Sequence, residues 1–255
     1  MRKIMLAITP EWAKLVLEGK KKDEIRKTFP KCELPCEVFL YVTNGEDILL
    51  AYEEYDHSSM SYYGTQYALI TKNIFAKKPS KDDEEDYNLY QNYREMYRYY
   101  SKEFKETKDG HERVLNGKVV AKFTLNRIER VEVEGQLYGQ HSVYREPGGA
   151  SDYVDEWENS FQERTRVTAE RLEEYMGRDY DMHICLWHID ELRVFDEPKS
   201  LSDFVGFGTP TYEQAKPFLE MFGEPYSKET YREHCERLGY TLKRPPQSWQ
   251  YVEEI

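Results

Sequence analysis

The sequence predicts an α+β fold with a small β core that helical segments interrupt. Short apolar or β-branched runs recur along the whole chain, and helical patterns separate them. The first and last of these runs both resemble strands, so their pairing would close a β-barrel. Because the expected core strands are spread over the full length, we predict one domain over residues 1–255 rather than two domains in series.

The expected core strands have recognisable boundaries. Thr9, followed by proline, is typical of a helix N-terminus, and Gly19 of the point where a helix ends. In the strand that comes next, Glu24 and Arg26 share one face. The expected strands are Lys3–Thr9, Lys22–Lys27, Glu37–Thr43, Gly117–Val133 (one long strand or a hairpin), Met182–Asp196 (one central strand) and residues 246–254.

Two segments, residues 52–114 and 211–238, are interpreted as insertions into this core. The first is polar and rich in tyrosine, and we expect it to interrupt the β pattern with a helix near Tyr87. Aromatic residues recur every three or four positions in that helix: Tyr90, Tyr93, Tyr97, Tyr100 and Phe104. A stacking platform for bases would show such a stripe, but packing of an amphipathic helix explains it better. The second insertion is expected to be a helical pair.

Helices are also expected between the two insertions. One runs through residues 152–165, and a second is capped by Thr168 and ends at Met176.

The charge of the chain is uneven. The formal net charge is −12, which argues against a general nucleic-acid coat. Residues 1–45 nevertheless hold nine Lys or Arg and six Asp or Glu, a net charge of +3. This asymmetry favours a local anion-binding patch on an acidic body. No apolar run approaches the ~18 residues of a membrane span, and the N-terminal run is interpreted as a strand, so we expect a cytoplasmic protein.

The four cysteines, Cys32, Cys36, Cys185 and Cys235, are few for this length and are expected to be reduced thiols. With His183 and His234 they would offer zinc ligands only if three distant segments converged. Buried thiols are the simpler interpretation, so we predict no metal and no cofactor.

The densest group of cations lies in "GKKKDEIRKTFPK", residues 19–31. The C-terminal end of the preceding helix favours cations at Lys20–Lys22. Arg26 offers a planar fork for a phosphate, a carboxylate or a guanine edge, and Glu24 can accept from an exocyclic amine. A desolvated Lys21 can act as a base or nucleophile with Glu24 as its partner. The alternative is structural: Glu24 pairs with Arg26, and the lysines are solvated.

Five more residues are candidates for ligand binding. Trp187 and His188 could stack on and hydrogen-bond a base, although a lone tryptophan on a strand more often belongs to the core. The other three lie near the C-terminus: Arg244, Ser248 and Trp249.

Three stretches, in this order, resemble ASCH-domain proteins of the PUA-like superfamily, of the phage or bacterial type. They are "LAITPEWAKLVLEGKKKDEIRKTFPK", "WHIDELRVFDEPKSLSDF" and "RPPQSWQYVEE", and together with their surroundings they cover about half of the chain. The resemblance implies a PUA-like small β-barrel core with flanking helices and helical insertions. It also implies a cleft between the first helix and the Glu-x-Arg strand that binds RNA or a nucleotide-like ligand.

Some small relatives hydrolyse an acylated cytidine with a lysine at the position that matches Lys21, and ribonuclease activity is ascribed to others. The amidohydrolase type has a threonine where this chain has Glu24, and the third carboxylate of that constellation has no recognisable counterpart here. The sequence therefore favours binding of RNA or of a modified nucleotide and leaves enzyme activity open. The alternatives are a small hydrolase of the amidohydrolase or ribonuclease type, and a protein-interaction module that works through residues 55–112.

Overall fold

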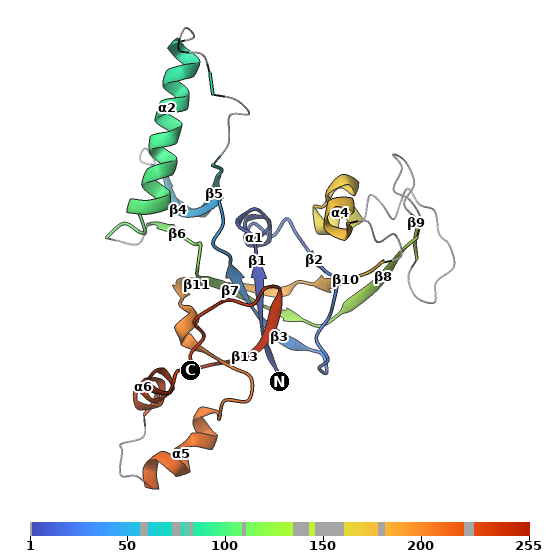
Figure 1. The fold of residues 1–255 in the computed structure, drawn as a ribbon, viewed down its shortest axis with the longest axis vertical. Helices are drawn as coiled ribbons and strands as arrows, with labels where there is room; N and C mark the ends of the chain where they lie inside the picture. The colour runs from blue at the N-terminus through green and yellow to red at the C-terminus, as the bar shows by residue number, and fades with distance from the viewer. Residues whose placement is uncertain are drawn as a thin grey trace.

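The protein has a mixed α+β architecture, and its described strands form three sheets (Figure 1). The computed structural model describes residues 2–56, 61–72, 78–79, 81, 84–108, 111–134, 143–145, 161–177, 182–221 and 227–255. Among the helices of this part of the chain, none is long and apolar enough to cross a membrane. The predicted helical stretch at residues 152–165 lies outside the described residues up to position 160, and residues 161–165 are helical.

The largest sheet has the N-terminal strand near its middle. β1 pairs with β13 in antiparallel orientation, with Lys3 opposite Val252 and Leu6 opposite Trp249. The predicted pairing of the first and last strands is therefore confirmed. On its other edge β1 pairs with β3 in parallel orientation. The order in the sheet is β11 (Asp190–Lys199), β7 (Val119–Leu125), β3 (Cys36–Val42), β1 (Lys3–Ile8), β13 (Trp249–Glu254) and β12 (Phe204–Gly206).

Two continuous segments of the chain pass from the first sheet into the second or back. β7 pairs with β3 in the first sheet, and the chain then bends so that β8 pairs with β10 in the second. The prediction that Gly117–Val133 is one strand or a hairpin is therefore wrong. Met182–Asp196 is likewise two strands, β10 and β11, in different sheets. The order is β2 (Asp23–Arg26), β10 (Met182–His188), β8 (Ile128–Glu134) and β9 (Val143–Arg145).

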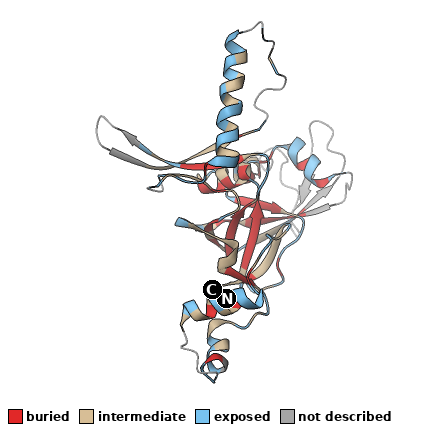
Figure 2. Ribbon diagram, turned by 60° about the vertical axis from the view of Figure 1, so that its left-hand side comes forward, coloured by how far each residue is buried: buried red, intermediate tan, exposed pale blue. Residues whose placement is uncertain are grey.

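The two bends lie together, because the Asn126 side chain donates a hydrogen bond of 2.7 Å to the Asp190 carboxylate. Leu6 and Leu40 from the first sheet and Trp187 from the second enter the same core cluster, and Figure 2 shows the buried residues concentrated there. Among the described strands the pairings do not close a barrel. Both edges of β1 are occupied by β3 and β13, so β2 has only β10 as a partner.

The chain passes from β1 to its parallel neighbour β3 through α1 (Pro10–Leu17) and β2. Thr9 adopts an extended conformation before Pro10, which occupies the first turn of the helix. Ala13, Val16 and Leu17 are buried against the sheet core. Gly19 lies just beyond the helix end with φ +67°, as the sequence predicts for a helix-terminating glycine.

The first insertion is an arm that projects from the body (Figures 1 and 2). Residues 52–114 were expected to interrupt the β pattern, but they contain most of a hairpin and a third strand. The third sheet has the order β5 (Ser61–Ile70), β4 (Ile48–Asp56) and β6 (Glu112–Val114). The helical part consists of α2 (Glu84–Arg98) and a π-helical turn, η1 (Tyr99–Glu103).

Core packing explains the aromatic stripe of this arm, as predicted. Phe104 is buried with Ile48, Leu50 and Ile70 of the hairpin, and Tyr93, Tyr97 and Tyr100 pack against this cluster. Tyr93 also donates a hydrogen bond of 2.6 Å to the Thr71 carbonyl.

The remaining helices lie at two other places. α4 (Ala169–Met176) stands beside α1 in Figure 1, and it is capped by Thr168 and ended by Gly177 as predicted. The expected helical pair is present as α5 (Tyr212–Met221) and α6 (Lys228–Leu238), at the opposite end of the molecule from α2. A 3-10 turn, η2 (Leu201–Asp203), leads from β11 into β12.

Candidate ligand-binding cleft

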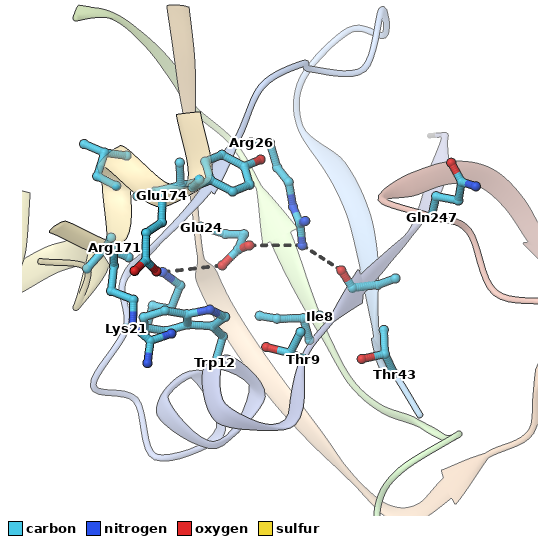
Figure 3. A pocket seen from close by; sticks show the side chains of 15 residues that line it. Ile8, Thr9, Trp12, Lys21, Glu24, Arg26, Thr43, Arg171, Glu174 and Gln247 are labelled. Carbon is cyan, nitrogen blue, oxygen red and sulfur yellow. Dashed lines mark hydrogen bonds and ion pairs between the residues drawn. The ribbon is translucent and has the colours of Figure 1, made fainter. Parts of the chain in front are cut away.

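A cleft of about 430 Å³ opens between β1 of the first sheet and β2 of the second (Figure 3). Six segments contribute to its walls: the C-terminal ends of β1 and β3, α1, β2, α4 and the loop before β13. The lining residues are Ala7, Ile8, Thr9, Trp12, Lys21, Glu24, Ile25, Arg26, Thr43, Val167, Arg171, Leu172, Glu174, Tyr175 and Gln247.

Two threonines reach the cleft because β1 and β3 are parallel neighbours. Parallel strands end at the same edge of a sheet, so the residues that directly follow them lie side by side. Thr9 follows β1 and Thr43 follows β3, and the Thr43 N–H donates a hydrogen bond of 2.8 Å to the Ile8 carbonyl. Two small hydroxyl-bearing side chains therefore line one side of the cleft.

Lys21 is a buried cation in the cleft wall. The backbone N–H groups of Lys20 and Lys21 both donate to the Leu15 carbonyl, which turns the chain sharply after α1. Only 2% of Lys21 is exposed. Its ammonium donates a hydrogen bond of 2.6 Å to the Thr165 carbonyl and lies 3.5 Å from Glu24 Oε2 and 4.9 Å from the centre of the Trp12 ring. Burial lowers the pKa of this ammonium, and the charge of Glu24 opposes that shift.

Glu24 and Arg26 share one face of β2, as their spacing predicts. Arg26 Nη2 lies 3.0 Å from Glu24 Oε1 and donates a hydrogen bond of 2.7 Å to the Ala7 carbonyl, so it spans the gap between β2 and β1. Ile25 enters a different core cluster. Glu24 Oε2 and Arg26 Nε are both buried, and neither has a hydrogen-bond partner within the described part of the chain. Two residues of the cleft lining therefore each keep one buried polar atom without a hydrogen bond to any described residue, although Glu24 Oε2 also lies 3.5 Å from the Lys21 ammonium.

α4 forms a further wall of the cleft. Nothing in the sequence indicated that this helix belongs to the site. Arg171, Glu174 and Tyr175 are three and four residues apart, so they share one helix face, and all three line the cleft. Arg171 lies over the ring of Trp12, 6.0 Å from its centre. Figure 3 shows the Glu174 side chain extending from α4 into the cleft. Thr168 marks the start of this helix in the sequence, but no pattern indicates what the helix faces.

The other candidate residues lie outside the lining. Trp187 is fully buried in the core and donates a hydrogen bond of 3.3 Å to the Thr28 carbonyl. Trp249 donates to the Thr28 hydroxyl over 3.0 Å. The Ser248 carbonyl accepts from the Ala7 N–H, and its neighbour Gln247, which was not a candidate, does line the cleft.

Lys20 and Arg244 are both exposed and do not line the cleft. Lys20 pairs with Glu18 at 2.8 Å.

The opposite face of β2 carries a second buried ionic group. Asp23 is 1% exposed, and its two carboxylate oxygens are bound by different partners: the Arg164 guanidinium and, at 2.8 Å, His188 Nδ1. Arg164 Nη2 also donates to Glu129 over 2.8 Å. His188, a candidate for ligand binding, therefore lies on the face that points away from Glu24.

Among the described residues, no three His, Cys, Asp or Glu side chains are grouped as they would be around a metal ion. All four cysteines are free thiols. Cys36 and Cys185 belong to the central core, and Cys235 packs with Val205 and with Tyr231, its neighbour on α6. Burial raises the pKa of the Cys185 and Cys235 thiols.

The fold and the cleft define an α+β protein with a partly buried polar site between two sheets. No family model and no curated protein matches the chain. Among solved structures it is similar to ASCH from Zymomonas mobilis, at 10% identity and a TM-score of 0.40, over 99% of this chain and 88% of that one. Two single-residue variants of that protein match at 9% and 10% identity, also with a TM-score of 0.40 and 99% of this chain covered. These structures bear the family name that the sequence motifs suggested.

Proposed function

We propose that the cleft binds one base of an RNA strand or of a modified nucleotide. The observation that carries the proposal is that two polar atoms of the cleft-lining residues, Glu24 Oε2 and Arg26 Nε, have no hydrogen-bond partner among the described residues. A base edge offers an N–H donor next to an acceptor and would pair with both atoms. Leaving a buried polar group without a partner costs about 1–3 kcal/mol, so a ligand that pairs with both would recover free energy.

Size and lining support the same proposal. The volume of about 430 Å³ is within the range of about 300–1,000 Å³ that is typical of small-molecule sites. Trp12 and Tyr175 provide aromatic surface on which a base can stack. Lys21, Arg26 and Arg171 outnumber the two carboxylates, which leaves the cleft cationic on an acidic body. Because that body repels RNA, the footprint should be a few nucleotides.

Titration with short single-stranded RNA and with free nucleosides, N4-acetylcytidine included, tests the proposal. Calorimetry should detect saturable binding that disappears when Lys21→Ala and Arg26→Ala are combined. A matched control, Lys228→Ala with Arg193→Ala, removes the same charge at exposed positions outside the cleft and should bind as the wild type does. Binding that survives the cleft double substitution would rule out this site.

A second candidate function is hydrolysis of a modified nucleoside or of RNA. The observation that favours it is Lys21, whose pKa is lowered by burial, since a lysine that loses its proton more easily can serve as a base or nucleophile. Glu24 would be its partner. Acylated cytidines and labelled RNA should then be turned over by the wild type, and turnover no higher than that of a Lys21→Ala control would exclude the enzyme.

A third candidate is protein binding through the arm. On α2 and η1, the side chains of Leu89, Met96 and Tyr99 are exposed. Deleting residues 55–112 separates this function from that of the cleft. RNA binding should persist in the deletion variant, and loss of RNA binding would show that the arm contributes to the cleft instead.

A further inference from the structure

Three consecutive residues of the second half of the chain, Arg164–Arg166, are bonded to four consecutive residues of the first half, Lys20–Asp23. Arg166 Nε donates to the Lys20 carbonyl over 2.9 Å, and the Lys21 ammonium donates to the Thr165 carbonyl over 2.6 Å. The Lys22 N–H donates to the Arg164 carbonyl over 2.6 Å, and the Arg164 guanidinium pairs with Asp23. Each of the four residues Lys20–Asp23 therefore makes a bond to residues 164–166, and these bonds fix the turn that carries Lys21.

Arg164 is the bridge in this arrangement. Its Nε pairs with Asp23 on β2 and its Nη2 with Glu129 on β8. The guanidinium group is planar and its donors are fixed in direction, so binding two carboxylates also fixes the backbone from which the side chain extends. Arg127 holds Glu129 from the other side at 3.0 Å. A lysine at position 164 could reach either carboxylate but could not present this rigid fork to both.

The backbone next to Arg164 is unusual at the same point. Arg166 has a φ of +60°, a conformation that residues other than glycine seldom adopt and that surrounding contacts must maintain. Thr165 is fully buried, donates its hydroxyl to the Phe161 carbonyl and accepts from the Val167 N–H. These contacts direct the Thr165 carbonyl toward the ammonium of Lys21.

The same segment leads directly into the α4 wall of the cleft. Val167 lines the cleft, Thr168 caps α4, and Arg171 follows one turn later. A change in the position of residues 164–166 would therefore alter the surroundings of Lys21 and the side chains that face it.

We infer that Arg164 is a positioning residue of the cleft: through Asp23 and Glu129 it holds the Thr165 carbonyl against Lys21 and places the α4 wall. Arg164 does not itself line the cleft. Its effect on a ligand rests on the proposed function, whereas its effect on Lys21 does not.

NMR titration of the Lys21 side chain tests this inference without a ligand, with the resonance assigned from a Lys21→Arg variant. In Arg164→Ala, water should reach the ammonium, so the pKa of Lys21 should rise toward its ordinary value. The affinity for the best-binding nucleoside or RNA should fall tenfold or more. Arg164→Lys should lie between wild type and Arg164→Ala in both measurements. The matched control is Arg232→Ala. Arg232 also bridges two carboxylates, Asp203 in η2 and Glu236 on α6, and its removal should change neither the Lys21 titration nor the affinity.

The outcomes separate the two proposals. A folded Arg164→Ala variant with an unchanged Lys21 titration overturns the positioning role, as does wild-type affinity in that variant. If the wild type binds none of the probes, the proposed function fails, and the Lys21 titration still decides the role of Arg164. If Arg164→Ala does not fold, Arg164→Lys decides: a Lys21 titration identical to that of the wild type would overturn the inference.

Discussion

The two faces of β2 bury similar charges with different results. Asp23 and Glu24 are neighbours, 1% and 5% exposed, and each meets two basic side chains. On the Asp23 face both carboxylate oxygens are bound, by Arg164 and His188. On the Glu24 face one oxygen is left without a hydrogen bond and lies in a cleft. Unused hydrogen-bonding capacity, and not buried charge itself, distinguishes a candidate site from a structural ion pair.

The largest effect should come from the Asp23 face. Asp23→Ala removes the buried carboxylate that Arg164 and His188 share and leaves Arg164, among the described residues, with Glu129 alone. Removing one partner of a buried ion pair costs about 3–5 kcal/mol. Urea denaturation should show a loss of that size in the free energy of unfolding. Asp196→Ala, at an exposed position of β11, should stay within about 0.5 kcal/mol of the wild type. A loss below about 1 kcal/mol for Asp23→Ala would contradict the structural role of this face.

On the Glu24 face the larger effect should be on binding. In Glu24→Gln the amide oxygen can still accept from Arg26, but an NH₂ group replaces Oε2, the acceptor without a hydrogen bond, and meets the donor of the ligand. The affinity for RNA or nucleoside should fall at least tenfold, about 1.4 kcal/mol, with less loss of stability than in Asp23→Ala. Calorimetry measures the first quantity and urea denaturation the second. The control is Glu213→Gln, the same substitution at an exposed position of α5, which should bind as the wild type does. If Glu24→Gln bound the ligand as tightly as this control, Oε2 would not contact the ligand.

The sequence predicted the residues on the Glu24 face better than those on the rest of the cleft. The reason is that the residues of the Glu24 face are close together along the chain and the others are distant from them. Lys21, Glu24 and Arg26 lie within six residues, so the helix end and the alternation of a strand suffice to bring them together. Thr165, which binds Lys21, is separated from it by 144 positions. The Arg171 face of α4 reaches the cleft through tertiary packing that no local pattern encodes.

The fold shows the same division between local and distant information. Core strands were found from their composition, and the pairing of β1 with β13 was confirmed. The bends that divide Gly117–Val133 and Met182–Asp196 between two sheets were missed, because a bent apolar run and a straight one have the same alternation. The hairpin at the base of the arm was missed because polar and charged residues interrupt its apolar positions, although the tyrosines in it favour strands.

The pH dependence of the free energy of unfolding tests whether Lys21, on the Glu24 side of β2, is buried in solution as it is in the structure. Because burial lowers its pKa below the ordinary value near 10.5, the unfolded chain holds this proton more tightly than the folded protein does. As the pH rises from the lowered pKa to about 10.5, the free energy of unfolding of the wild type should increase relative to that of Lys21→Met. One group contributes at most about 1.4 kcal/mol per pH unit, and other titrating groups cancel in the difference. Parallel stability curves for the two proteins would mean that Lys21 is solvated.

The smallest effect is expected for His188, and it tests how separate the two faces are. His188 contacts only one oxygen of Asp23, and Arg164 still binds the other in a His188→Gln variant. Loss of one hydrogen bond at a partly exposed side chain should cost about 1 kcal/mol in urea denaturation. The affinity of the cleft should not change, because His188 lies across β2 from Glu24 and does not line the cleft. If His188→Gln instead weakened binding as much as Glu24→Gln does, the two faces would be coupled through Asp23 and Arg164. The Asp23 face would then belong to the site, and the separation drawn from hydrogen-bonding capacity would be wrong.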